Sequence, residues 1–363
     1  MGSSLPTVLV TGISGNLGVR LLPLLADYQV VGVDLNPPQS VHPLRFVSLD
    51  VGKEASCREL FLLIREARPI AVLHLAFVID PVRTGVLDLD RMWQINVAGT
   101  ARIMEAITEA NRDEPIVQKF IFPSSVSAYG SELPEPVSED FPLHGHTLAY
   151  ATHKMESDKV VQQRAPALRG CSAYILRPHI FAGASVENYL IGAFRGTPNG
   201  RGKWGARMRD QGKRLPCMLP YGKKYVDNKI QFVHVDDMAR LLAYIVARTD
   251  PEARRLTVMN VAGRGESLTF ARCIEMAHAK LVRVPTKAVF HRVLRTMWNL
   301  GISAIPPEAF PYMTGEYIMN TDRLRQFLGD DYENVIRWSI ADAFADSFAG
   351  TATTAVQHSA AAP

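Results

Sequence analysis

Several features are scarce in this sequence, and each scarcity excludes a class of protein. The longest apolar run, near Ile70 to Ile79, is interrupted by His74 and stops at Asp80, whereas a membrane span takes about 20 apolar residues. The formal net charge is only +4, and no nucleic-acid-binding motif accompanies it, so no nucleic-acid partner is expected. A basic segment followed by an apolar core is missing near the N-terminus, so we expect a cytoplasmic protein.

Metal-binding and disulfide patterns are also missing. The cysteines lie far apart and show no C-x-x-C spacing, which excludes a zinc site or a disulfide framework of the usual kinds. The histidines at three candidate positions (His74, His153 and His234) share no spacing typical of metal ligands, so we expect them to be structural. We therefore predict no metal. The four cysteines are Cys57, Cys171, Cys217 and Cys273.

What the sequence does contain is a regular alternation of β-rich runs and helical windows over its first 180 residues. This alternation predicts βαβ units, and hence an α/β fold with a doubly wound parallel sheet. The expected strands are Thr7–Val10, Val30–Val33, Arg45–Ser48, Ala71–Leu75, Lys119–Phe122 and Ala173–Leu176. The expected helices are Leu17–Ala26, Cys57–Ala67, Trp93–Ala110 and Tyr150–Arg164, with a later one at Val235–Ala247.

The regularity ends after residue 180. We expect residues 5–180 to form the sheet domain and 181–345 to form mainly a smaller, discontinuous lobe that binds the substrate, with a segment around 230–247 returning to the sheet domain. The stretch Gly196–Lys224 is rich in glycine, proline and basic residues, which is typical of a long loop. Residues 350–363 are expected to be a disordered tail.

A glycine-rich loop directly follows the first expected strand. It has the sequence Thr11-Gly12-Ile13-Ser14-Gly15-Asn16-Leu17-Gly18 and opens a helix. Glycines at these places allow a tight turn, close approach of a pyrophosphate and packing of helix on strand. Asp34 closes the second strand, where a carboxylate accepts hydrogen bonds from ribose hydroxyls and repels a 2′-phosphate. The pattern therefore predicts NAD, in preference to NADP.

A second motif carries the chemistry of a proton transfer. Tyr150 and Lys154, at i and i+4, project from one face of a helix. The ordinary pKa of a phenol is about 10, and a nearby ammonium would lower it, so that Tyr150 could exchange a proton with a substrate hydroxyl. A serine of the segment Ser124-Ser125-Val126-Ser127, just past the fifth strand, faces the crevice where ligands of such sheets bind. We expect its hydroxyl to hold the substrate oxygen.

With these motifs the chain resembles an extended short-chain dehydrogenase/reductase of the NAD-dependent epimerase/dehydratase type, whose fold is the Rossmann fold. The resemblance covers roughly residues 5 to 345 and is strongest up to residue 185. Further matching segments are Asp50-Val51, His74-Leu75-Ala76, Asn96-Val97-Ala98-Gly99-Thr100, Tyr129-Gly130, Arg177-Pro178 and Phe232-Val233-His234-Val235-Asp236-Asp237.

The resemblance implies roles for particular residues. Ser125, Tyr150 and Lys154 would be catalytic, and Lys154 would also bind the nicotinamide ribose. The residues expected to bind NAD are Gly12, Ser14, Gly15, Asn16, Leu17, Gly18, Asp34, Asp50, Val51, Leu75, Ala76, Asn96, Tyr150, Lys154 and Pro178.

Departures from the family pattern narrow the reaction. Sugar-nucleotide dehydratases similar to this chain place an Asp and a Glu after the catalytic hydroxyl residue, where this chain has Val126 and Ser127. A 4,6-dehydratase is therefore not expected. Phe77 replaces a usual small residue and His179 replaces a usual Asn. The change at His179 puts a specific sugar-nucleotide pocket in question, because that Asn commonly lies near the substrate in the family that the chain resembles. The candidate substrate residues are Phe77, Ser127, His179 and Arg214.

Two segments leave alternatives open. The window from Arg195 to Lys224 holds nine basic residues and one acid, Asp210. It is expected to be either a cap that clamps a nucleotide-sugar diphosphate or a solvated loop. Residues 287–300 are amphipathic at helical spacing. We expect this helix to pack on the second lobe, with a membrane-surface helix as the alternative.

The sequence thus predicts an NAD-dependent enzyme that transfers a hydride at a secondary alcohol carbon. The first expected substrate is a nucleotide-sugar, which the enzyme would epimerise. The alternative is a net dehydrogenase or reductase of a hydrophobic alcohol or ketone, similar to hydroxysteroid or dihydroflavonol members of the family. A non-catalytic NAD-binding scaffold is a more remote alternative, since such proteins typically lose the Tyr or Lys. The family resemblance is the only basis on which we expect a homodimer.

Overall fold

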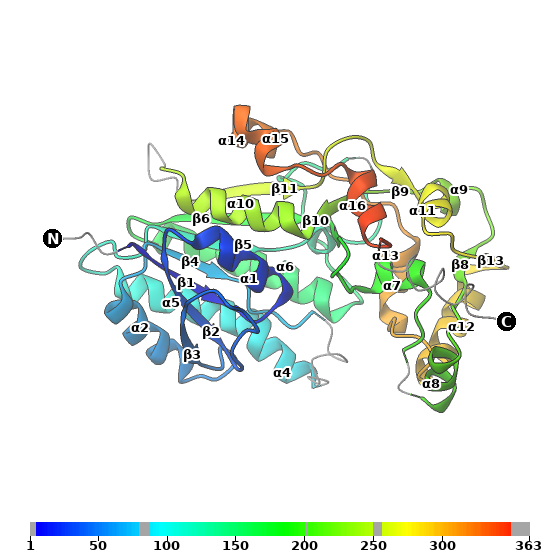
Figure 1. Cartoon of the computed structure of the whole chain (residues 1–363), viewed down its shortest axis with the longest axis horizontal. Helices are drawn as coiled ribbons and strands as arrows, with labels where there is room; N and C mark the ends of the chain where they lie inside the picture. The colour runs from blue at the N-terminus through cyan, green and yellow to red at the C-terminus, as the bar shows by residue number, and fades with distance from the viewer. Residues whose placement is uncertain (1–4, 80–87, 135, 200–201, 250–255, 350–363) are drawn as a thin grey trace, which may run out of the picture.

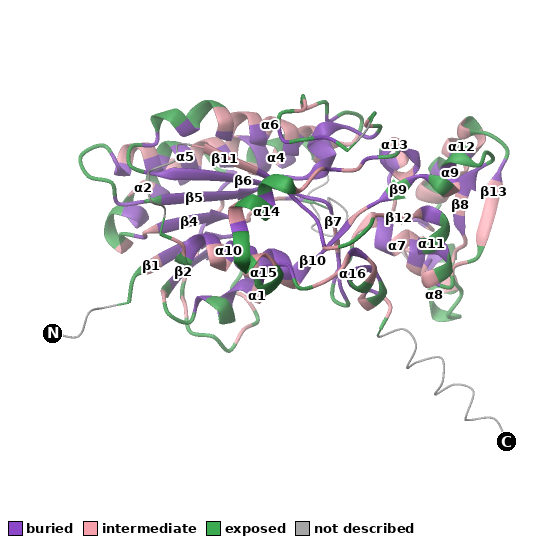
Figure 2. Ribbon diagram, turned by 90° about the horizontal axis from the view of Figure 1, so that it is seen from above, coloured by how far each residue is buried: buried purple, intermediate pink, exposed green. Residues whose placement is uncertain are grey.

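The computed structural model describes residues 5–79, 88–134, 136–199, 202–249 and 256–349. Its centre is a parallel sheet of seven strands in the order β11-β6-β5-β4-β1-β2-β3 (Figure 1). Most residues of the central strands are buried, as a sheet covered on both faces requires (Figure 2). The strands are β1 Thr7–Thr11, β2 Gln29–Asp34, β3 Arg45–Ser48, β4 Ala71–His74, β5 Lys119–Pro123, β6 Ser172–Pro178 and β11 Leu256–Val261.

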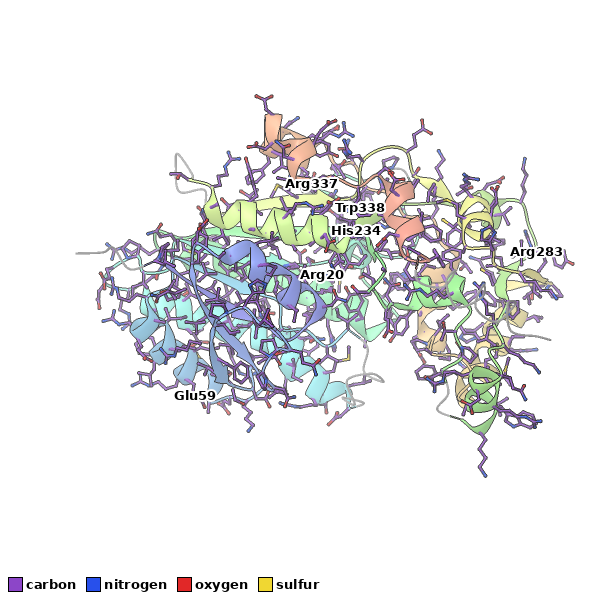
Figure 3. The ribbon with its side chains drawn as sticks, viewed as in Figure 1. Arg20, Glu59, His234, Arg283, Arg337 and Trp338 are labelled. Carbon is purple, nitrogen blue, oxygen red and sulfur yellow. The ribbon has the colours of Figure 1, made fainter. Side chains whose placement is uncertain are left out.

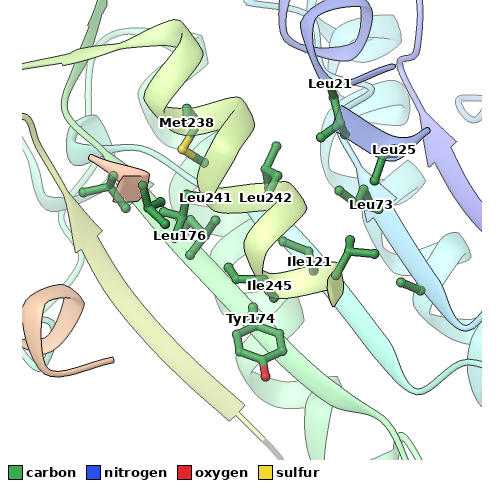
Figure 4. Packing of buried hydrophobic residues seen from close by; sticks show 14 of the residues in the cluster. Leu21, Leu25, Leu73, Ile121, Tyr174, Leu176, Met238, Leu241, Leu242 and Ile245 are labelled. Atoms are coloured by element: carbon green, nitrogen blue, oxygen red, sulfur yellow. The ribbon is translucent and has the colours of Figure 1, made fainter. Parts of the chain in front are cut away.

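Helices cover both faces of this sheet. On one face, α1 and α10 pack with α14 and α15, and Leu21, Leu242 and Tyr174 are completely or almost completely buried among them (Figure 4). On the other face, α2, α5 and α6 contribute the buried side chains. The predicted doubly wound α/β fold is therefore confirmed. The bounds are α1 Asn16–Leu21, α2 Ser56–Ala67, α5 Gly99–Ala110, α6 Ala149–Arg164, α10 Val235–Ala247, α14 Asp322–Leu328 and α15 Tyr332–Val335.

Most of the remaining elements form a smaller lobe around a core of its own. It contains three two-stranded sheets, β7–β10 and β8–β13 (both parallel) and β9–β12 (antiparallel). Its strands are β7 Ile180–Ala182, β8 Cys217–Pro220, β9 Lys229–Ile230, β10 Phe232–His234, β12 Leu268–Thr269 and β13 Leu281–Val284. Its helices are α7 Tyr189–Arg195, α8 Lys203–Asp210, α9 Lys224–Asp227, α11 Phe270–Met276, α12 Lys287–Asn299, α13 Phe310–Thr314 and α16 Ile340–Asp346.

The chain crosses between the two parts more than once. Helix α10 packs on the sheet, β11 adds a seventh strand beside β6, and α14 and α15 join the same core. The return near 230–247 was expected from the sequence, but the strand at Leu256–Val261 was not. The division at residue 180 stays a prediction, and the tail at 350–363 lies outside the described residues.

Three expected segments differ in detail. The helix expected at Leu17–Ala26 is α1 followed by a 3₁₀ turn over Leu22–Leu25, since Pro23 has no amide hydrogen to donate. The helix expected at Trp93–Ala110 is α4 (Leu89–Trp93), a π turn at Gln94–Ala98, and α5.

The stretch Gly196–Lys224 is not one long loop, because it contains α8 and β8. The residues of β8 pair with those of β13, which comes much later in the chain. A pairing between such distant segments leaves no local pattern in the sequence. The amphipathic segment after Thr286 is α12, and Phe290 and Leu294 on its apolar side are buried.

Candidate functional site

The glycine loop between β1 and α1 is shaped by contacts that leave no room for side chains. Gly12 has φ +72°, and a Cβ there would lie 2.4 Å from the Ala76 amide nitrogen. A Cβ on Gly18 would lie 2.5 Å from the Ile13 carbonyl oxygen. The Gly12 amide donates to the Val33 carbonyl (2.8 Å), which ties the loop to β2. The loop is therefore a close-packed backbone turn that suits a phosphate-bearing ligand.

Asp34, at the end of β2, lies beside this loop. Its carboxylate accepts hydrogen bonds from the amides of Ser14 (3.0 Å) and Leu35 (2.7 Å). The Ser14 hydroxyl donates to the Asn36 carbonyl. These bonds fix the carboxylate next to the glycine loop, the position that the predicted ribose contact requires.

Asn16 connects the glycine loop to the C-terminal lobe. Its side-chain amide donates to the Ser185 carbonyl (2.9 Å) and hydroxyl (3.1 Å). Arg20 of α1 donates to the Asn16 oxygen (3.0 Å) and forms an ion pair with Asp236 at the start of α10. These contacts hold the glycine loop and the segment after β7 together.

His234, which precedes α10, is part of the same junction. Its ring stacks on Trp338, with centroids 4.1 Å apart, and Figure 3 shows the two side chains near Arg20. One ring nitrogen accepts from the Asp236 amide (3.1 Å) and the other lies 3.2 Å from an Asp346 oxygen. In the described part of the chain, no group of three His, Cys, Asp or Glu side chains could hold a metal ion.

Ser125, Tyr150 and Lys154 are brought together by the end of β5 and the first turns of α6. A side-chain hydrogen bond joins Tyr150 to Ser125. The Ser125 oxygen also accepts from the Ser127 hydroxyl (2.9 Å) and amide (3.2 Å). Three hydroxyl groups therefore meet at one point, and a substrate oxygen placed there would find both a proton donor and an acceptor.

Burial raises the pKa of Tyr150, and the Ser125 hydrogen bond lowers it by a smaller amount. The net shift is upward, opposite to the lowering expected from Lys154. Burial also lowers the pKa of the Lys154 ammonium, to about 7. A lysine with this pKa is only about half protonated near neutral pH, so it supplies a weaker positive field than an ordinary lysine.

The Lys154 ammonium is enclosed on several sides. It donates to the Pro123 carbonyl (2.6 Å) and lies 3.6 Å from the centroid of the Phe77 ring and 4.9 Å from that of Phe122. The Phe77 ring in turn meets the Tyr150 ring edge to face, with centroids 6.0 Å apart. Phe77, predicted as a substrate contact, therefore also positions both helix residues.

His74 and Asn96 are buried polar residues whose hydrogen bonds fix the segments that carry the site residues. Both His74 nitrogens have partners, Thr11 (2.8 Å) and Thr100 (3.0 Å), and burial lowers the pKa of His74 to about 3. Asn96, in the π turn, exchanges hydrogen bonds with the backbone of Val78 (2.7 and 3.0 Å). Asn96 thus fixes the segment that carries Phe77, which agrees with the supporting role that the resemblance implies for residues 96–100.

A cavity of about 410 Å³ runs from the glycine loop past these residues into the C-terminal lobe. Its lining brings together many predicted residues and leaves others out. Those that line it are Gly12, Gly15, Asn16, Leu17, Gly18, Leu75, Phe77, Ser125, Ser127, Tyr150, Lys154, Pro178 and His179. Those that are not part of its lining are Ser14, Asp34, Asp50, Val51, Ala76, Asn96 and Arg214.

The residues outside the lining have other contacts in the structure. Asp50 forms an ion pair with Arg91 and accepts from the Gly52 amide (2.9 Å), while Val51 is buried. The Arg214 guanidinium donates to the carbonyls of Arg195 (2.7 Å) and Phe194 (3.1 Å). Arg214 is therefore bonded to the backbone of its own lobe.

His179 lines the cavity but has no free ring nitrogen. Its Nδ1 accepts from the Ile180 amide (2.9 Å) and its Nε2 donates to the Tyr317 carbonyl (2.8 Å). The ring stacks on that of Tyr317, and burial lowers the pKa of His179 to about 4. A neutral, fully bonded imidazole offers the cavity mainly an apolar surface.

Ser124 also belongs to the site, although it was not expected from the sequence. Its side-chain oxygen is buried, lines the cavity and has no hydrogen-bond partner in the structure. An orphaned buried hydroxyl is costly and indicates a place for a polar ligand atom. The only signal in the sequence was its position next to Ser125.

Comparison with known proteins assigns the family. The model of the NAD dependent epimerase/dehydratase family matches residues 8–262. The chain therefore belongs to that family, as the predicted resemblance implied. Within the described residues, no helix has the length and apolar character needed to cross a membrane.

Curated relatives are similar over part of their length. UDP-glucose 4-epimerase of Erwinia amylovora is 29% identical over 203 residues, 53% of this chain and 58% of the relative. The Haemophilus influenzae protein of the same name is 30% identical over 203 residues, 53% of this chain and 57% of the relative. The chain thus spans little more than half the length of these relatives.

Solved structures share the fold over nearly the whole chain. A UDP-glucose 4-epimerase of Thermotoga maritima with UDP-glucose superposes with a TM-score of 0.64 at 18% identity, covering 96% of this chain and 99% of that one. A short-chain dehydrogenase/reductase superfamily protein of Agrobacterium tumefaciens with bound NAD gives a TM-score of 0.65 at 20% identity, covering 97% and 99%.

Proposed function

We propose that this protein is an NAD-dependent oxidoreductase that transfers a hydride at a secondary alcohol carbon, with Ser125, Tyr150 and Lys154 as its catalytic residues. The observation that carries the proposal is the meeting of the Tyr150 and Ser125 hydroxyls beside Lys154, in a cavity that the glycine loop also lines. Family membership and the NAD bound to the Agrobacterium protein support the choice of cofactor.

The glycine loop fits such a cofactor. Side chains at Gly12 and Gly18 would collide with the backbone, so the loop keeps main-chain atoms at its surface. The glycine loop and Asp34 would hold the adenosine half, and Lys154 the nicotinamide ribose. When bound, NAD would accept or return the hydride, and its positively charged oxidised ring would lower the pKa of the Tyr150 phenol.

The residues of the chain would handle the proton and the oxygen. In the oxidation direction, the Tyr150 phenolate would accept the proton of the substrate hydroxyl while the alcohol carbon gives up a hydride, for which bound NAD would be the acceptor, so that a ketone would result. Ser125 would donate to the ketone oxygen. In the reverse direction, Tyr150 returns the proton as hydride reaches the carbon.

Two outcomes share this chemistry. An epimerase keeps the ketone bound and returns the hydride to its opposite face, whereas a dehydrogenase releases the ketone. The names of the curated relatives favour epimerisation of a nucleotide-sugar. The apolar lining of the cavity favours the second candidate, net oxidation or reduction of a hydrophobic alcohol or ketone.

The nucleotide that copurifies with the protein tests the proposal. The full chain is purified without added cofactor and denatured, and the released nucleotide is identified and counted. Near-stoichiometric NAD supports an epimerase, which has to retain its cofactor between half-reactions. An empty protein that binds added NADH supports net redox chemistry, and a protein that binds neither contradicts the proposal. A cytoplasmic location and a homodimer remain predictions.

A further inference from the structure

The C-terminal lobe contributes mostly apolar side chains to the cavity. The apolar residues of the lobe that line the cavity include Ile180, Phe181, Val186, Leu190 and Met313. Leu148, which precedes α6 of the sheet domain, adds another apolar side chain. Val186 and Leu190 are buried even though the cavity reaches them. A wall of this kind favours an apolar ligand, because it offers no partners for polar atoms that lose water on binding.

Most polar atoms of the lobe residues that line the cavity already form hydrogen bonds within the protein. The Tyr312 hydroxyl both donates to the His146 carbonyl (3.0 Å) and accepts from the His146 amide (3.0 Å). The Asn188 side chain donates to the Phe181 carbonyl (2.8 Å) and accepts from the Ile191 amide (2.9 Å). These bonds stabilise the lobe itself, and breaking them for a ligand would cost free energy.

Beyond the glycine loop, which would bind the diphosphate of NAD through its backbone, the charges of the lining do not suit a second diphosphate. Among the described residues that line the cavity, Lys154 is the only lysine or arginine, and burial lowers its pKa to about 7. Glu187 adds a carboxylate to the same lining. A diphosphate is usually bound by arginine or lysine side chains, and a nearby carboxylate would repel it.

The basic segment of the lobe does not supply the missing cations. Arg195 donates to the carbonyls of Ser347 (3.0 Å) and Val186 (2.9 Å), and Arg214 donates to backbone carbonyls as described above. Lys203, Arg207 and Arg209 on α8 are exposed and are not part of the cavity lining. The described basic side chains of this segment therefore either donate hydrogen bonds to backbone carbonyls or face solvent.

From these contacts we infer that the substrate is an apolar secondary alcohol, or the corresponding ketone, and not a nucleoside diphosphate sugar. This inference rests on the proposed function, and it assigns the apolar wall as the surface that selects the substrate. The Ser125–Tyr150 pair receives the single polar group of the molecule, and the unpartnered hydroxyl of Ser124 is a further polar group of the lining at this end of β5. In the oxidation direction the products are the ketone, NADH and one proton.

Binding to an inactive variant tests the inference without a known substrate. The Tyr150→Phe protein is saturated with NADH and titrated by calorimetry with androstenedione, menthone and UDP. We expect at least one ketone to bind more tightly than UDP. The inference is overturned if UDP binds more tightly, or if neither ketone shows saturable binding.

A substitution in the wall provides a matched control. Met313→Lys places an ammonium in the apolar lining and is expected to weaken ketone binding about tenfold or more. Leu300→Lys makes the same change at an exposed leucine of the same lobe, outside the lining, and is expected to change ketone binding less than about twofold. If the two substitutions weaken ketone binding equally, the apolar wall is not the surface that selects the substrate, and the inference is overturned.

The NADH titration of each variant separates a failure of the inference from a failure of the proposed function. A protein that fails to bind NADH contradicts the proposed function as well as the inference. A protein that binds NADH normally and prefers UDP contradicts only the inference. Normal NADH binding by Met313→Lys also shows that this variant is folded.

Discussion

The ammonium nitrogen of Lys154 lies 3.6 Å from the centroid of the Phe77 ring. On its other side the same nitrogen donates to the Pro123 carbonyl. This enclosure removes water from a charged group, and burial lowers its pKa from 10.5 to about 7. The ring also contacts Tyr150. Phe77 therefore links the chemistry of the two helix residues.

The first prediction concerns the dependence of stability on pH. Because the pKa of Lys154 is lower in the folded chain, the unfolded chain binds more protons between about pH 7 and 10.5. This residue therefore makes the free energy of unfolding rise with pH through that window. Lys154→Met removes the contribution. Urea unfolding at several pH values should show wild type gaining stability relative to the variant as pH rises, and a constant difference would contradict it.

The second prediction concerns the proton transfer. Tyr150→Phe removes the hydroxyl and should lower turnover by about 10² to 10⁴ fold, the usual contribution of a general acid or base. NADH affinity should change less than about twofold, since the ring and its contact with Phe77 remain. Tyr221→Phe, at an exposed tyrosine outside the cavity lining, is the control. Unchanged turnover in Tyr150→Phe would rule out the proposed role.

The third prediction concerns the choice of cofactor. Asp34→Asn removes the charge that the amides of Ser14 and Leu35 hold beside the glycine loop. We expect NADH affinity to fall about tenfold, and the preference for NADH over NADPH to shrink, because a charge-assisted hydrogen bond and a repulsion are lost together. Fluorescence titration with both nucleotides measures this. Asp27→Asn, at an exposed aspartate, should change neither, and an unaltered preference in Asp34→Asn would contradict the assignment.

The fourth prediction concerns the glycine loop. Gly12→Ala combines a positive φ with a collision against the Ala76 amide, whereas Gly212→Ala has a similar φ and open space around it. Gly212→Ala should therefore cost only about 1–2 kcal/mol of stability. Gly12→Ala should cost more and should also abolish NADH binding. Equal NADH affinity in the two variants would show that the loop does not bind the cofactor.

The fifth prediction concerns a buried ion pair behind the site. Arg177 donates two hydrogen bonds to Asp158 of α6 (2.8 and 3.0 Å), and both side chains are at most 2% exposed. Arg177→Met leaves the carboxylate unpaired and should destabilise the protein by about 3–5 kcal/mol. The double change Arg177→Met with Asp158→Leu should recover part of this loss in urea unfolding. No recovery would mean that the unpaired charge is not the cause.

Local patterns were enough to predict much of the fold and the grouping of Ser125, Tyr150 and Lys154. The six expected strands and the helix at Val235–Ala247 are all present, because apolar runs, glycine turns and helical periodicity are short-range signals. Tyr150 and Lys154 share a helix, so their spacing alone placed them together. Ser125 follows a strand whose carboxyl end faces the same crevice.

What could not be predicted depends on segments far apart in the sequence. The pairing of β11 with β6 and of β8 with β13 joins distant residues. The raised pKa of Tyr150 results from burial by several such segments. Arg214, expected near the substrate, donates instead to backbone carbonyls of its lobe. The basic residues around Arg214 in the sequence do not show that its guanidinium already donates hydrogen bonds to the backbone.

Calorimetric titration of the full chain with NADH, after removal of any copurified nucleotide, tests the central claim most directly. We predict one saturable site per chain, with binding lost in Gly12→Ala and retained in Tyr150→Phe. The absence of saturable NADH binding to the wild-type protein would contradict it.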